Sequence, residues 1–95
     1  MSLSFESDRL HVPDHVVTRA IKGATVLLNA DTGRYFTLDE SGARAWAALT
    51  ASASIDQAYR TLLAEYAVDP EVLRRDLDVL IGGLAAEGLV EVRRG

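Results

Sequence analysis

Residues 26–49 read VLLNADTGRYFTLDESGARAWAAL and contain the clearest structural signals in the chain. Two short apolar runs, at residues 26–28 and 35–38, flank a turn-rich tetrad at residues 30–33, which is the pattern of a β-hairpin. Directly after the second run, Asp39-Glu40-Ser41 is a helix-start signal, and apolar residues then recur at helical spacing. The stretch therefore predicts a hairpin that leads directly into a helix.

Three apolar side chains of this stretch are candidates for the core. Side chains alternate between the two faces of a strand, which predicts Phe36 and Leu38 on the buried face. Trp46 is the single tryptophan of the chain. A tryptophan on the apolar stripe of a short helix is more often a core anchor than a ligand platform. We therefore expect Phe36, Leu38 and Trp46 in the core.

The residues before the hairpin predict one more strand. Residues 15–21 (HVVTRAI) are rich in β-branched side chains, and Lys22-Gly23 predicts a tight turn into a strand at residues 24–29. The economical arrangement is an antiparallel meander of three strands. Residues 1–14 show no sustained period and predict a loosely held arm, the last part of which could instead form an edge strand or cover the sheet.

Two further helices are predicted after the first one. Beyond a polar linker, Ser54 can cap a helix over residues 55–66, whose apolar positions follow the i, i+3, i+4, i+7 rule. Asp69-Pro70-Glu71 marks the start of the last helix, and Gly88 should end it as a left-handed residue. Residues 89–92 then predict a short final strand or a tail.

Gly82 and Gly83 lie inside the last predicted helix, where each glycine costs about 1 kcal/mol relative to alanine. Two reasons for this cost remain open. The first is close packing of the helix, and the second is room for another backbone or side chain to approach.

These elements predict an α+β fold in which a three-stranded antiparallel sheet is followed by three helices. At 95 residues the chain is large enough for one modest core. We divide it into a flexible or edge arm at residues 1–14, one domain at residues 15–92 and a tail at residues 93–95. Because the hairpin has a free edge, exchange of strands between two copies could produce a homodimer.

Composition argues against several classes of function. Hydrophobic residues make up 48% and charged residues 25% of the chain, as in a folded globular domain. The formal net charge of -4 argues against a nucleic-acid partner, because such proteins carry a basic footprint. No apolar run is long enough to span a membrane, cysteine is absent and no signal peptide is recognisable. We therefore expect a cytoplasmic protein with no membrane partner.

The sequence offers no convergent set of catalytic or metal-binding side chains. His11 and His15 are four residues apart, but Pro13 disfavours the helix that would bring them to one face. Ser41 has no histidine placed beside it, and capping of the first helix explains this serine better. No G-x-G-x-x-G or P-loop pattern occurs. We expect no enzymatic activity, no metal site and no cofactor.

With catalysis and nucleic-acid binding disfavoured, the remaining class of function is binding at a protein surface. The exposed edge of a sheet in a small protein is either protected or used, and a used edge pairs with the main chain of an extended peptide. Residues 34–38 connect directly to the helical half of the chain, so a helix could form the second wall of a groove beside this strand. The alternative is that Arg34 and Tyr35 are ordinary exposed strand residues.

Residues 26–49, followed by LLAEYAVD and then DLDVLIGGLAAEGLV, resemble the PqqD family, whose small domains are known as RiPP recognition elements. The resemblance covers about residues 15–92. It rests on the order of apolar positions and on Leu27, Asp31, Gly33, Leu38, Gly42, Trp46, Asp76, Leu84, Gly88 and Leu89. It implies a winged helix-turn-helix-like fold. It also implies that the protein binds the leader segment of a ribosomally made precursor peptide as an added strand, between the third strand and the third helix, and presents it to a modifying enzyme.

Carried onto this chain, the resemblance implies a strand wall at residues 34–38 and a helix wall at residues 72–83. On the strand wall, Tyr35 and Thr37 would pair through their backbone, beside Arg34, Phe36 and Leu38. On the helix wall, Val72 and Val79 would form apolar pockets, Arg75 and Asp76 would make polar contacts, and Gly83 would lie at the end. Asp76 could instead orient the helix against the hairpin as a structural partner.

Two branches of the family fit the sequence unequally. Members from the pyrroloquinoline quinone (PQQ) pathway tend to carry Pro-Glu in the second turn and Cys-Asp-Gly after the first helix, whereas this chain has Ala30-Asp31-Thr32-Gly33 and no cysteine. The pattern D-x-G-R-Y followed by L-x-x-x-G-x-x-x-W looks more like the stand-alone leader-binding proteins of lasso-peptide pathways. The partners would then be a leader peptidase and a cyclase. In the alternative, a chaperone of the PQQ precursor peptide, the partner would be a radical SAM enzyme.

A winged-helix DNA-binding protein is the alternative from another class, because it has the same order of strands and helices. Its recognition helix would be the second or third, where acidic residues outnumber basic ones and oppose phosphate. The acidic residues there are Asp56, Glu65, Asp69, Glu71, Asp76 and Asp78, against Arg60, Arg74 and Arg75.

Overall fold

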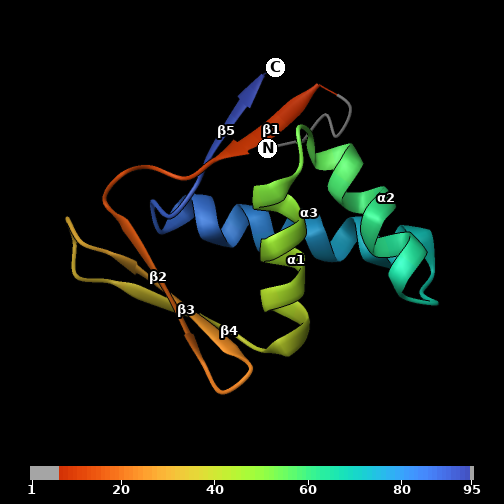
Figure 1. Ribbon diagram of the computed structural model, residues 1–95. Coiled ribbons are helices and arrows are strands. Elements are labelled where there is room, and N and C mark those ends of the chain that lie inside the picture. The colour runs from red at the N-terminus through yellow and green to blue at the C-terminus, as the bar shows by residue number, and fades with distance from the viewer. Residues whose placement is uncertain (1–6, 95) are drawn as a thin grey trace.

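The computed structural model describes residues 7–94 and shows a sheet followed by three helices (Figure 1). The elements in chain order are β1 (Asp8–His11), β2 (Val16–Ile21), β3 (Ala24–Asn29), β4 (Tyr35–Leu38), α1 (Glu40–Ala51), α2 (Ile55–Glu65), α3 (Pro70–Ala86) and β5 (Glu91–Arg94). Strands β2, β3 and β4 form an antiparallel sheet in that order. The predicted α+β fold is therefore confirmed.

Both predicted turns of the meander form as their residue types require. Lys22 and Gly23 have φ values of 46° and 84°, so two consecutive left-handed residues join β2 to β3. In the second turn, the Asn29 side-chain oxygen accepts hydrogen bonds from the backbone N–H groups of Asp31 and Thr32. Gly33 follows with φ of 75°. These local bonds set the register in which β4 returns along β3.

Each helix begins at a side-chain cap. Asp39 accepts a hydrogen bond from the Gly42 N–H at 2.8 Å, and Ser54 accepts one from the Gln57 N–H. Asp69 caps α3 just before Pro70, as predicted. The prediction that Ser41 caps α1 is wrong, because its hydroxyl lies within the first turn and donates to the Asp39 carboxylate.

The core consists of two joined clusters of buried side chains. The helical cluster comprises Ala48, Leu49, Ile55, Ala58, Leu62, Leu77 and Ile81, and the sheet cluster comprises Leu27, Leu38, Trp46, Leu84, Leu89 and Val90. Leu10 and Leu80 pack against both clusters and connect them. Leu38 and Trp46 are buried as predicted, whereas Phe36 is only half-buried and packs against the sheet cluster.

The two ends of the described chain pair with each other. β1 and β5 form an antiparallel ribbon in which Leu10 lies opposite Val92. Of the alternatives for the N-terminal arm, residues 8–11 form a strand, and its partner includes Arg93 and Arg94 from the expected tail. The rest of the arm at residues 1–6, and Gly95, lie outside the described residues. Figure 1 shows this ribbon and the three-stranded sheet at opposite ends of α1.

Candidate functional site

One edge of the three-stranded sheet, β4, has no neighbouring strand among the described residues. The Asn29 N–H donates to the Arg34 carbonyl at 2.8 Å, which makes Asn29 and Arg34 a hydrogen-bonded pair. In an antiparallel ladder such pairs alternate with non-bonded pairs. By this alternation Phe36 and Leu38 bond to β3, while the main-chain groups of Tyr35 and Thr37 face the open edge. The edge therefore offers two residues for pairing with another strand.

The side chains of β4 divide between the helical side and solvent. Leu38 is buried and the half-buried Phe36 packs against the sheet cluster, so both point toward the helices. Tyr35 is 69% exposed and Thr37 is also exposed. A strand added beside β4 would lie with one face toward the helices and the other toward solvent.

The C-terminal end of α3 packs against the start of β4. A Cβ atom built on Gly83 would lie 3.8 Å from the Phe36 ring, which is ordinary van der Waals contact. The Arg34 Nε lies 2.8 Å from a carboxylate oxygen of Glu87, just beyond the helix. The Asn29 side-chain amide also donates to the Glu87 carbonyl at 3.1 Å. Strand and helix are thus in contact at this end of the predicted cleft between β4 and α3.

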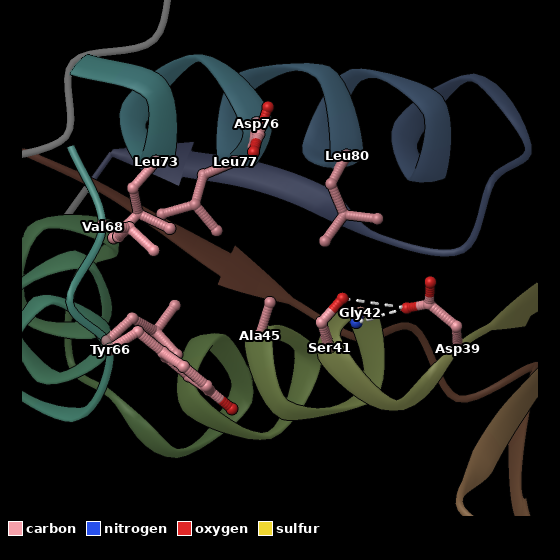
Figure 2. A pocket seen from close by; sticks show the side chains of 11 residues that line it. Asp39, Ser41, Gly42, Ala45, Tyr66, Val68, Leu73, Asp76, Leu77 and Leu80 are labelled. Carbon is pink, nitrogen blue, oxygen red and sulfur yellow. Dashed lines mark hydrogen bonds between the residues drawn. The ribbon is translucent and has the colours of Figure 1, made fainter. Parts of the chain in front are cut away.

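Beyond the last residue of β4 lies a pocket of about 320 Å³ between α1 and α3 (Figure 2). Its walls come from the start of α1, the end of α2, the segment that joins α2 to α3, and the middle of α3. The lining residues are Asp39, Ser41, Gly42, Ala45, Leu62, Tyr66, Val68, Leu73, Asp76, Leu77 and Leu80. Asp39 directly follows Leu38, the last residue of β4, so the pocket begins where the open edge ends.

Apolar side chains line most of this pocket, and its two charged side chains, Asp39 and Asp76, are acidic. Figure 2 shows Asp76 on the α3 side and Asp39 beside the start of α1, with no basic residue in the lining. Hydrogen bonds from the Gly42 N–H and then the Ser41 hydroxyl lower the pKa of Asp39, so this carboxylate is charged at neutral pH. Asp76 lines the pocket from the α3 side and is exposed.

The residues predicted for the helix wall separate into two groups. Asp76 lines the pocket and Gly83 faces the Phe36 ring, so these two lie at the cleft. Val72 and Val79 are 45% and 70% exposed, and neither lines the pocket. Arg75 is likewise exposed and outside the lining. Gly83 thus lies against β4 and Asp76 lines the pocket, whereas the roles of Val72, Arg75 and Val79 stay predictions.

Several pocket residues were not predicted as site residues. Asp39, Ser41 and Ala45 lie on the first turns of α1, where the sequence indicated only a helix start. Tyr66 and Val68 belong to the segment between α2 and α3 and are both more than two-fifths exposed. The direct succession of β4 and α1 is a signal that could have identified Asp39. Nothing local indicates that the α2–α3 segment would reach the same cavity.

The part of the chain that the structure describes shows neither a metal cluster nor a membrane-spanning helix. Within residues 7–94 there is no group of three or more His, Cys, Asp or Glu side chains that could hold a metal ion. His15 lies 3.1 Å from the Gly88 carbonyl and 3.5 Å from the Asp31 carboxylate, where it joins the hairpin to the end of α3. None of the helices described is long and apolar enough to cross a membrane.

A family model and a solved structure each match most of this chain. Residues 24–90 match the model of the PqqD family, described as coenzyme PQQ synthesis protein D. A solved structure titled "TbiB1 in Complex with the TbiA(beta) Leader Peptide" is 36% identical, with a TM-score of 0.77. The match covers 84% of this chain and 93% of the chain in that structure. No curated protein matches the sequence.

Proposed function

This chain belongs to the PqqD family, and from that premise we propose that it binds the leader segment of a ribosomally synthesised precursor peptide. The leader adds as a β-strand to the open edge of β4, beside α3, and the protein delivers it to a modifying enzyme or leader peptidase. The protein itself is a non-catalytic binding partner. Its solved relative, 36% identical, is titled as a complex with a leader peptide.

One observation carries this proposal: the main-chain groups of Tyr35 and Thr37 face an edge with no partner strand among residues 7–94, and a pocket begins at Asp39 just beyond it. Such an edge gives affinity through main-chain hydrogen bonds, and the adjoining cavity gives sequence preference through side chains. Arg34, Phe36 and Leu38 form the rest of the strand wall. Val72, Arg75, Asp76, Val79 and Gly83 form the helix wall that we propose.

We favour the lasso-peptide branch, because residues 31–46 carry the D-x-G-R-Y pattern followed by L-x-x-x-G-x-x-x-W. The partner enzymes are then a leader peptidase and a cyclase of the same pathway. The description of the matching family model supports the second candidate, a chaperone of the PQQ precursor that works with a radical SAM enzyme. The genes beside this one discriminate between the two, since each pathway encodes a different precursor and enzyme.

The test is a fluorescence anisotropy titration of a labelled leader peptide, taken from the precursor encoded beside this gene, with the full chain. We expect saturable binding that is lost in Tyr35→Pro. Proline removes the N–H group that faces the open edge, while the β3 side of the ladder keeps its bonds. The matched control is Tyr35→Ala, which keeps the N–H and should bind.

Two further measurements make the titration decisive. Circular dichroism must show that Tyr35→Pro retains the wild-type melting behaviour, so that loss of binding is not loss of the fold. If the wild-type chain binds none of the precursors encoded nearby, or if Tyr35→Pro binds as well as wild type, edge pairing at β4 is wrong.

A further inference from the structure

We propose that Asn29 is a positioning residue of the peptide site: it fixes the start of β4 against the C-terminal end of α3, so that the open edge of β4 is held ready for a strand. Asn29 is buried and acts through β4 rather than by touching the peptide. This inference rests on the proposed function and extends it, because it assigns a role in leader affinity to a residue outside the two walls of the site.

Asn29 joins the turn before β4 to α3 through a full set of hydrogen bonds, and only 4% of its surface is exposed. Its main-chain N–H donates to the Arg34 carbonyl, and its carbonyl accepts from the Gly33 N–H, both at 2.8 Å. Its side-chain oxygen accepts from the N–H groups of residues 31 and 32, at 3.0 and 3.3 Å. Its side-chain nitrogen donates to the Glu87 carbonyl at 3.1 Å. One side chain therefore shapes the turn and ties it to the end of α3.

The chemistry of an amide suits both ends of this tie. The turn presents two N–H donors and the end of α3 presents a carbonyl acceptor, so the side chain between them must accept at one end and donate at the other. A carboxylate of the same shape accepts from the turn but, when ionised, has no hydrogen to donate to Glu87. The surrounding space is tight, since a Cβ atom on Gly88 would lie 2.8 Å from the Asn29 amide nitrogen.

Two further contacts join the sheet to the same end of α3, and both are more exposed. The Arg34 Nε lies 2.8 Å from a Glu87 carboxylate oxygen, with the Arg34 side chain 69% exposed. The His15 Nε2 lies 3.1 Å from the Gly88 carbonyl, with the His15 side chain 32% exposed. Solvent weakens polar contacts at exposed positions, whereas a buried hydrogen bond is costly to lose. The Asn29 tie is therefore the member of this junction on which the placement of β4 depends most.

The placement of β4 matters because the proposed pairing uses few main-chain groups. Tyr35 and Thr37 offer the open groups, and so short an edge gives a peptide little to compensate for a displaced strand. If β4 moves away from α3 in part of the molecules, only the remaining fraction binds. The apparent dissociation constant then rises by the inverse of that fraction. A tie that holds β4 in place thus raises affinity without a contact to the peptide.

Stopped-flow fluorescence anisotropy with the labelled leader peptide, on the full chain, tests this role. Asn29→Asp and Asn29→Ser both keep an acceptor for the turn and remove the donor to Glu87, and the serine variant adds no charge. We expect each to weaken leader binding about three- to tenfold through slower association. The dissociation rate should stay unchanged, because the bound peptide itself holds β4 in place.

Two control variants separate positioning from stability. Thr32→Ala alters the same turn at an exposed position, where the Thr32 hydroxyl accepts from the Arg34 N–H, and it leaves the tie to α3 intact. It should bind the leader as wild type does. Leu10→Ala loosens the core at β1, remote from the turn, and should also keep the wild-type association rate. Urea denaturation of each variant shows whether the losses of stability are comparable.

The outcomes separate this inference from the proposed function. Folded Asn29 variants with wild-type affinity would overturn the inference alone. Faster dissociation would also overturn it, because it would make Asn29 a contact of the peptide, and so would an equal loss of affinity in Leu10→Ala. If neither Asn29 variant folds, Gly88→Ala crowds the same amide from the α3 side and carries the same expectation. If the wild-type chain binds none of the precursors encoded nearby, the proposed function falls and this inference with it.

Discussion

At the scale of single residues, the glycines near the end of α3 have different reasons for being there. Gly88 has φ of 70°, and a Cβ atom there would lie 2.8 Å from the Asn29 side-chain amide. Gly83 faces the Phe36 ring at a distance that a Cβ atom would tolerate, and a Cβ on Gly82 would meet open space. Close packing therefore explains neither Gly82 nor Gly83. The second reason, room for an approaching chain, fits Gly83, which lies at the cleft.

This difference predicts opposite effects of two alanine substitutions on stability. Gly88→Ala should lower the free energy of unfolding by about 1–2 kcal/mol, because it forces a left-handed conformation and a collision with Asn29. Gly82→Ala should raise it by about 0.5–1 kcal/mol, because a helix interior favours alanine and no neighbour obstructs the methyl group. Urea denaturation measures both. A destabilising Gly82→Ala would mean that this position has an unrecognised contact.

The N-cap of α1 makes stability depend on acid pH. Hydrogen bonds from Gly42 and Ser41 lower the pKa of Asp39 in the folded state. A carboxyl group whose pKa is lower in the folded than in the unfolded chain stabilises the fold. This stabilisation is complete at pH values above the pKa in the unfolded chain, about 3.9, and is lost as the pH falls through the pKa in the folded chain. Asparagine caps the helix without titrating. The difference in Tm between wild type and Asp39→Asn should therefore shrink from about pH 5 to about pH 2.

Thermal melts of the two proteins across this pH range measure the effect. Glu65, whose pKa is lowered by its hydrogen bond with Arg44, titrates in both proteins and cancels in the difference. A Tm difference that stays constant with pH would show that the Asp39 charge contributes nothing to the cap.

At the scale of elements, the binding cleft depends on how β4 and α3 meet. They are held together at one end by the Phe36 ring against Gly83 and by the Arg34–Glu87 ion pair, and the pocket begins at Asp39, just after the other end of β4. Val79 lies between these ends on the exposed surface of α3 and is 70% exposed. An exposed valine of this kind contributes little to folding, so its substitution tests the helix wall without disturbing the core.

We expect Val79→Asp to weaken leader binding about tenfold or more, because it places a charge where the peptide would bury an apolar side chain. Its melting temperature should stay close to that of wild type. Ala47→Asp is the matched control, since it adds an acid to an exposed helix position away from the cleft. Equal affinities for the two variants would remove Val79 from the wall.

At the scale of the whole molecule, the β1–β5 ribbon closes the end of the core that is remote from the sheet (Figure 1). Leu10 in β1 packs against both clusters, and Val92 opposite it packs against the helical cluster. The ribbon therefore contributes to the core, and none of its residues lines the pocket or pairs with β4. Its two strands come from the two ends of the described chain.

This separation predicts that stability and binding can be uncoupled. Leu10→Ala should lower the free energy of unfolding by about 1–3 kcal/mol. This is less than the loss expected for a fully buried leucine, because Leu10 is only half-buried. For a domain of this size that corresponds to a decrease in Tm of several degrees. Leader affinity at room temperature should be unchanged. A parallel loss of affinity would show that the ribbon supports the cleft as well as the core.

Much of the molecule follows from local sequence. The strands β2 to β4, the turns at Lys22-Gly23 and at residues 30–33, and the caps at Ser54 and Asp69 were predictable. Turn residues and caps act on backbone atoms a few positions away, so a short stretch of sequence is enough to predict them. The resemblance to the PqqD family placed the site at residues 34–38 beside the last helix, and the open edge of β4 lies there.

The packing of distant segments accounts for the rest. The pocket joins Asp39 and Ala45 to Tyr66 and Asp76, four positions that become neighbours only when α1, α2 and α3 pack. The β1–β5 ribbon likewise needs the two ends of the described chain to meet. No periodicity or turn signal encodes such contacts, because hydrophobic burial is not directional and chain connectivity decides which faces meet. The sequence alone therefore specifies the strand that we propose pairs with a peptide, whereas only the tertiary structure forms the pocket beside its end.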